Sequence, residues 1–63
     1  MRLNIKKLRS EMKRQHMKQS ELARRLGVTP QRVHYILNNG TLSYRVTDML
    51  ARVLNVNSKD LIL

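Results

Sequence analysis

The stretch QSELARRLGVTPQRVHYILNNG, Gln19–Gly40, decides how this chain folds. Its first part, Gln19–Leu26, predicts a short amphipathic helix, because its apolar residues recur at helical spacing. Gly27 follows, and glycine is common just past a helix end because a left-handed backbone costs it least. Thr29 and Pro30 are a typical helix start, since threonine accepts from free N–H groups and proline needs none at the first helical position.

A second amphipathic helix is predicted roughly over Pro30–Leu37, with Val33, Ile36 and Leu37 as its apolar stripe. Two helices this short are not stable alone, so a third surface must hold the pair at a large angle. The stretch is therefore a predicted helix-turn-helix, and the second helix is its recognition helix.

This helix-turn-helix resembles that of the Cro/CI-type (XRE-like) repressors of phages and related bacterial regulators. The matching residues are Gln19, Glu21, Leu22, Ala23, Leu26, Gly27, Val28, Thr29, Val33, Ile36, Asn39 and Gly40. The resemblance implies an all-α, lambda-repressor-like compact bundle of about five short helices, with the helix-turn-helix at helices 2 and 3. We expect residues 1–63 to form this single domain. The core between the two helices is expected to hold Leu22, Leu26, Val28, Val33 and Ile36.

Composition argues against several classes of protein. The chain has no Cys, and His16 and His34 stand too far apart to suggest a zinc site, so no disulfide or metal is expected. The four carboxylates are scattered along the chain and form no pattern typical of a catalytic site. We therefore expect no enzymatic activity, no cofactor and no small-molecule ligand. No apolar run approaches the roughly 20 residues of a membrane span, and the N-terminus lacks the apolar core of a secretory signal. We expect no membrane partner and a cytoplasmic, nucleoid-associated location in a bacterial or phage-infected cell.

The charge of the chain is strongly basic and unevenly distributed. Thirteen Lys and Arg oppose four acidic residues, which gives a formal net charge of +9. Residues 1–32 carry ten of the basic residues and two Glu, whereas residues 33–63 carry three and two Asp. A basic excess beside a helix-turn-helix is typical of a phosphate-binding surface, although a solvated surface could carry it too. We therefore expect double-stranded DNA as the partner.

A first helix is predicted roughly over Asn4–Gln15, where Asn4 is a suitable N-cap. Its apolar stripe is Ile5, Leu8 and Met12. The basic residues that crowd the opposite side are Arg2, Lys6, Lys7, Lys13 and Arg14.

The resemblance places the end of this first helix and the start of the second closest to the DNA backbone. Arg14 and Lys18 are therefore expected to contact phosphates ahead of Lys6. Lys18 also stands where Ser or Thr usually caps the second helix, so a weaker cap is expected there.

Related proteins commonly pair an Arg late in the first helix with a Glu late in the recognition helix. In a gap-free alignment the matching residues are Met12 and Leu37, so a hydrophobic contact would replace the ion pair. An alignment with three extra residues in the first helix would match Arg9 instead and leave it without a partner at Leu37. We prefer the gap-free alignment.

The outward face of the recognition helix is expected to contact DNA. Gln31 is the strongest candidate, because its amide carries a paired donor and acceptor suited to adenine, and an Arg can bridge two acceptors of guanine. For Tyr35 the alternative is a partly buried side chain. The expected base contacts are Pro30, Gln31, Arg32 and Tyr35. The expected phosphate contacts are Arg14, Lys18, Gln19, Thr29, His34, Asn38, Asn39 and Thr41.

Asn38–Leu42 is predicted to be a loop, and Ser43 to cap a fourth helix that ends at Asn55. The expected apolar stripe of that helix is Val46, Met49, Leu50, Val53 and Leu54. A last turn then begins at Asn57 or Ser58. The chain closes with three apolar residues, Leu61–Leu63, of which one or two are expected in the core and the remainder in a homodimer contact.

Three functions compete. The leading hypothesis is a transcriptional regulator, usually a repressor in this family, that binds a pseudo-palindromic operator as a homodimer. An antitoxin that represses its own operon and also binds a toxin is the first alternative, but a compact chain offers little to wrap around a toxin. A cationic peptide for RNA or membrane surfaces is the second, and it would lack the turn over Gly27–Thr29.

Overall fold

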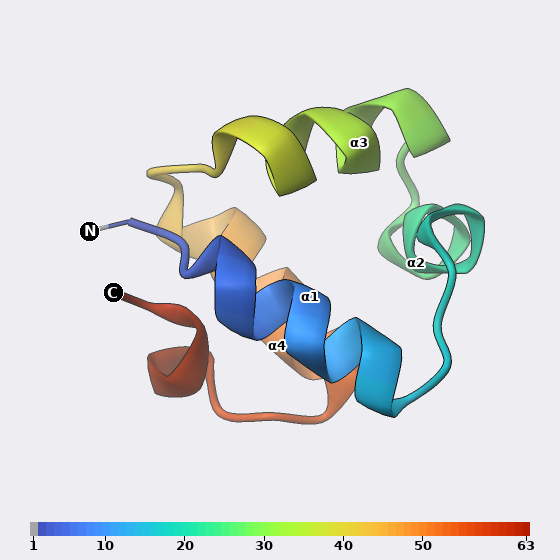
Figure 1. The fold of residues 1–63 in the computed structure, drawn as a ribbon. Helices are drawn as coiled ribbons and strands as arrows, with labels where there is room; N and C mark the ends of the chain where they lie inside the picture. The colour runs from blue at the N-terminus through green and yellow to red at the C-terminus, as the bar shows by residue number, and fades with distance from the viewer. Residues whose placement is uncertain (1) are drawn as a thin grey trace.

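In residues 2–63, which the computed structural model describes, four α-helices are followed by a 3-10 turn (Figure 1). The elements are α1 (Ile5–Arg14), α2 (Gln19–Leu26), α3 (Pro30–Asn39), α4 (Tyr44–Leu54) and η1 (Ser58–Leu61). This arrangement confirms the expected all-α fold class. Met1, the first residue of the expected domain, lies outside the described residues. Within residues 2–63, none of the helices has the length and apolar composition needed to cross a membrane.

Side-chain caps explain where three of the helices begin. Asn4, Thr29 and Ser43 each accept with a side-chain oxygen from the N–H three residues on, at 3.1, 3.2 and 3.3 Å respectively. These bonds confirm the predicted starts of α1, α3 and α4. Lys18 precedes α2 and makes no side-chain cap, as expected.

α3 is longer than predicted, because it includes Asn38 and Asn39, which were expected in the following loop. Both amides fold back onto the helix: Asn38 Nδ2 donates to the His34 carbonyl at 2.8 Å, and Asn39 Nδ2 donates to the Tyr35 carbonyl at 3.1 Å. The helix stops only at Gly40, whose φ of 75° lies in the region that favours glycine.

The core is aliphatic and draws on all four helices and η1. Its buried apolar residues are Leu3, Leu8, Met12, Leu22, Ala23, Val33, Ile36, Leu37, Leu50, Ala51, Leu54 and Leu61. Of the residues expected between α2 and α3, Leu26 is partly buried against this core and Val28 is 37% exposed. The prediction for Val28 is wrong, because this residue follows the left-handed Gly27 at the surface turn between the helices.

α4 buries a different stripe from the one predicted. Met49 is 38% exposed, whereas Thr47 and Ala51 are buried. Thr47 tolerates burial because its hydroxyl donates to the Ser43 carbonyl at 3.1 Å, so no polar group is left unsatisfied. The predicted residues that do contact the core are Val46, Leu50, Val53 and Leu54.

Main-chain hydrogen bonds hold the first described residues and the last residues of the chain, and these two segments lie near each other in Figure 1. The Leu3 N–H donates to the Thr41 carbonyl at 3.1 Å, and the Leu63 N–H donates to the Arg2 carbonyl at 2.9 Å. The first described residues therefore lie between the segment after α3 and the last residues of the chain.

The three apolar residues that close the chain have different environments. Leu61 is fully buried, Ile62 is partly buried and forms a β-bridge to Leu3, and Leu63 is 74% exposed. This distribution agrees with the expectation that only one or two of them belong to the core.

Candidate nucleic-acid interface

α2 and α3 pack against each other at a large angle, so that in Figure 1 α2 is seen nearly end-on while α3 lies across the view. Gly27 joins them with a φ of 77°. The N–H groups of Gly27 and Val28 both donate to the Ala23 carbonyl, at 2.9 and 3.0 Å. Ala23 is buried and small, so the two backbones can approach closely. The predicted helix-turn-helix is confirmed.

The outer face of α3 is free of contacts with the core. The residues expected to contact bases are all exposed there, and they are Pro30, Gln31, Arg32 and Tyr35. Tyr35 is 58% exposed, so most of its side chain is available to a partner. The Thr29 hydroxyl accepts from the Arg32 N–H, which fixes the geometry of the first turn that carries Gln31.

Of the residues expected to contact phosphates near the end of α3, Asn38 is exposed and Thr41 is partly buried, and both are already bonded within the chain. The Asn38 amide nitrogen lies 3.2 Å from His34 Nε2, in addition to its bond to the His34 carbonyl. Thr41 Oγ1 accepts from the Ser43 N–H at 3.1 Å. The Asn39 amide keeps a second N–H and the Thr41 hydroxyl keeps its own proton for a phosphate, whereas the Asn38 amide nitrogen already lies within hydrogen-bond distance of two His34 atoms.

A groove between α1 and the start of α2, the Lys18 groove, brings basic residues together beside α3. Its lining includes Arg9, Lys13, Lys18, Gln19 and, from α3, Leu37. Among the described residues, none that lines it is acidic. The positive end of the α2 dipole opens here, with first-turn N–H groups that no side chain caps. The groove is thus suited to a phosphate.

Arg9 and Lys13 are the residues of this groove that sequence analysis did not select. Their spacing of four positions places them on one side of α1, which is a signal that the sequence contains. The sequence does not indicate that this side, rather than the side of Arg14, adjoins the start of α2.

Arg9 also connects α1 to the recognition helix. Its Nη2 donates to the Leu37 carbonyl at 3.1 Å, near the end of α3, where helix carbonyls lack partners and favour a cation. Met12 and Leu37 are both buried in the core, as the gap-free alignment expects. Arg9 is not left without a partner, because it bonds the main chain of Leu37 instead of a carboxylate.

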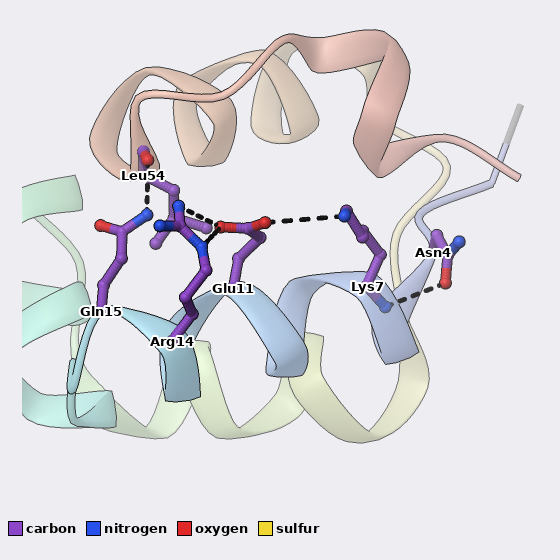
Figure 2. Close-up of polar contacts among 6 residues, drawn as sticks. All are labelled: Asn4, Lys7, Glu11, Arg14, Gln15 and Leu54. Atoms are coloured by element: carbon purple, nitrogen blue, oxygen red, sulfur yellow. Dashed lines mark hydrogen bonds and ion pairs between the residues drawn. The ribbon is translucent and has the colours of Figure 1, made fainter.

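Arg14 lies elsewhere, in an ion-pair cluster around Glu11 (Figure 2). Its Nε and Nη2 donate to Glu11 Oε2 at 2.9 and 2.7 Å, and Lys7 Nζ lies 3.6 Å from Oε1. The hydrogen bonds from Arg14 hold the pKa of the Glu11 carboxyl below its usual value. Figure 2 shows this cluster on the side of α1 that faces Leu54, whose carbonyl accepts from Gln15 Nε2 at 2.7 Å. The structure therefore does not bring Arg14 to the Lys18 groove.

A larger open groove, of about 950 Å³, lies where α3 ends, and we call it the Lys6 groove. Tyr35, Asn39 and Thr41 line it from α3 and the following segment, and Arg2 and Lys6 line it from the start of the chain. Asn39 and Thr41 are therefore separated from the Lys18 groove, so the expected phosphate contacts do not form one continuous set.

A family model described as a Cro/C1-type HTH DNA-binding domain matches residues 7–62, a range that includes α2 and α3 in full. Comparisons with curated proteins and with solved structures find no significant match.

Proposed function

Because this chain belongs to the Cro/C1-type helix-turn-helix DNA-binding domains, we propose that it is a transcriptional regulator, most simply a repressor, that recognises an operator in duplex DNA. The family is non-catalytic and acts by binding DNA. By this proposal the chain works as one domain, at the nucleoid in the cytoplasm of a bacterial or phage-infected cell. Bound over a promoter, it would keep RNA polymerase from the DNA.

The exposed face of α3, with basic residues beside it, is the observation that carries this proposal. A recognition helix contacts base edges with its N-terminal residues when it lies in the major groove. Gln31 and Arg32 stand there with hydrogen-bonding groups suited to adenine and guanine. Pro30 offers an apolar contact, for example to a thymine methyl group, and Tyr35 extends the contact by one helical turn.

The Lys18 groove supplies the phosphate contacts on one side of α3. Lys18 and Gln19 retain the role expected of them, and Arg9 and Lys13 join them because they line the same groove. Thr29, His34 and Asn38 are placed by this proposal at the edges of the interface. Asn39 and Thr41 contribute from the other side, while Arg14, held by Glu11, takes no part.

The homodimer is part of the proposal and is supported by apolar residues that remain exposed. Leu42 and Leu63 are 72% and 74% exposed, and Tyr44 is 49% exposed. Leu42 and Leu63 both line the Lys6 groove, so they form one apolar region beside the last residues of the chain. A two-fold contact through this region would present two recognition helices to two half-sites of a pseudo-palindrome.

The test is a selection of bound sites from random duplexes, followed by footprinting on the selected sequence. We expect an inverted pair of half-sites with centres about one helical turn, roughly 34 Å, apart. Enrichment of a single unrepeated half-site would contradict the dimer, and the absence of any enriched sequence would contradict sequence recognition.

Salt dependence tests the Lys18 groove separately. Each phosphate contact contributes about −0.9 to the slope of log affinity against log salt. Lys18→Ala should therefore flatten the slope by roughly one unit and weaken all sequences alike. Lys59→Ala is the matched control, because Lys59 is exposed on η1, which lies on the other side of α1 from α3 (Figure 1). An unchanged slope for Lys18→Ala would assign Lys18 to solvent.

A further inference from the structure

We propose that the Lys6 groove seats the sugar–phosphate backbone of the second DNA strand, with Lys6 and Arg2 as its phosphate contacts. This inference rests on the proposed function, because it takes α3 to lie in the major groove. It adds the start of α1 to the DNA interface, a segment that sequence analysis placed behind Arg14.

The two grooves lie on opposite sides of α3. Leu37 lines the Lys18 groove, whereas Tyr35 and Asn39 line the Lys6 groove. Residues two positions apart in an α-helix point about 200° apart around its axis, so Leu37 faces away from both Tyr35 and Asn39. A helix about 10 Å across nearly fills a major groove about 12 Å wide, so it meets one strand on each side. The Lys18 groove serves one strand, and the Lys6 groove is placed for the other.

The charge of the Lys6 groove is complementary to a phosphate backbone. Lys6 and Arg2 are both exposed and line it, and no described side chain in its lining is acidic. Among residues 2–63 neither side chain forms an ion pair, in contrast to Lys7 and Arg14, which are both engaged by Glu11. Tyr35 and Asn39 add hydrogen-bond donors on the α3 side.

Lys6 occupies a position that is unfavourable for the isolated protein. The first turn of α1 contains no acidic residue, and a cation there opposes the positive end of the helix dipole. Glu11 offsets the charge of Lys7 at 3.6 Å, but the charge of Lys6 has no such partner among the described residues. A phosphate in the groove would offset it, so the position is consistent with a binding role and not with a stabilising one.

Arg2 is held in place for this contact, since its carbonyl accepts from the Leu63 N–H at 2.9 Å. Leu42 and Leu63, which we assign to the homodimer contact, line the same groove. The DNA strand in this groove would therefore run close to the partner subunit, toward the segment between the two half-sites.

The test combines affinity, salt dependence and stability on the full chain and its selected operator duplex. Lys6→Ala and Arg2→Ala should each flatten the salt slope by about one unit. Lys6→Glu should weaken binding more than Lys6→Ala, yet its melting temperature without DNA should equal or exceed that of the parent, because the new carboxylate favours the start of α1. Lys59→Ala is again the control. Ethylation interference should place the phosphates that depend on Lys6 and those that depend on Lys18 on opposite strands.

Several outcomes would overturn the inference while leaving the proposed function intact. One is that Lys6→Ala and Arg2→Ala leave the slope of log affinity against log salt as it is in the parent, in an experiment where Lys18→Ala flattens that slope. Another is that ethylation interference places the phosphates that depend on Lys6 and those that depend on Lys18 on the same strand. A third is a raised dimer dissociation constant for Lys6→Ala without DNA and with no change in slope, which would make the groove a contact between subunits. Failure of the parent chain to bind duplex DNA would instead remove the proposed function itself.

Discussion

Gln31 is the residue on which operator specificity is proposed to depend most. It is exposed in the first turn of α3, whose geometry is fixed by the Thr29 cap and by Pro30 at the first helical position. Both atoms of its amide can therefore meet one base edge together. This bidentate geometry is what distinguishes adenine from the other bases in the major groove.

Gln31→Ala should cost about 1–3 kcal/mol of binding free energy on the selected operator. The loss should fall on one base pair per half-site, while binding to random duplex barely changes. Measured affinities for the operator and its single-base variants check this. Arg24→Ala, which removes a charge from the exposed side of α2, is the control and should have the smaller specific effect. If Gln31→Ala distinguishes the operator from its single-base variants as well as the parent does, α3 docks on DNA in a different orientation from the one proposed.

At the scale of elements, the start of α3 serves stability and recognition together. The Thr29 hydroxyl accepts from the Arg32 N–H at 3.2 Å and so satisfies one of the free donors of the first turn. The same hydroxyl is proposed to stand at the edge of the DNA interface. A substitution that keeps the cap but changes the charge can therefore separate the two roles.

Thr29→Ala should lower the free energy of unfolding by about 1 kcal/mol through loss of the cap. Thr29→Asp should restore that stability, because Asp is as good an N-cap, yet should weaken DNA binding, because its charge repels phosphate. Thermal melting and duplex titration of both variants check this. Parental DNA affinity in Thr29→Asp would place Thr29 away from the backbone and leave it as a cap alone.

At the scale of the whole molecule, the last residues of the chain complete the core and border the proposed subunit contact. Leu61 is fully buried, whereas Leu63 is 74% exposed beside Leu42. Folding should therefore depend on the first of these residues and dimerisation on the second. Deleting Leu61–Leu63 together would mix the two effects.

Leu61→Ala should lower the free energy of unfolding by about 2–5 kcal/mol at every protein concentration, because it leaves a cavity in the core. Leu63→Ser should change the folding of the monomer little but should raise the dimer dissociation constant, since it removes exposed apolar surface from the contact. Melting curves over a range of concentrations, together with sedimentation, check both. If the dimer dissociation constant of Leu63→Ser equals that of the parent, Leu63 is not part of the subunit contact.

Local signals in the sequence specify the order of the elements and most of their boundaries. Caps at Asn4, Thr29 and Ser43 and the turn at Gly27 act over three or four residues, so local chemistry is enough to specify them. Helical periodicity likewise predicts the apolar stripes of α1 and α3. It does not predict the end of α3, because Asn38 and Asn39 are as common in loops as at a helix end, where here their amides donate to helix carbonyls.

Which basic residues face the proposed DNA surface depends on how the helices pack against one another. A helical wheel separates the apolar stripe of α1 from its basic side, but it does not indicate which edge of that side adjoins α3 and which adjoins α4. Packing settles the question: Glu11 is buried on the α4 side and engages Lys7 and Arg14, so Arg9 and Lys6 remain on the two sides of α3. The rotation of a helix about its own axis depends on contacts between residues distant in sequence, and local spacing does not contain them.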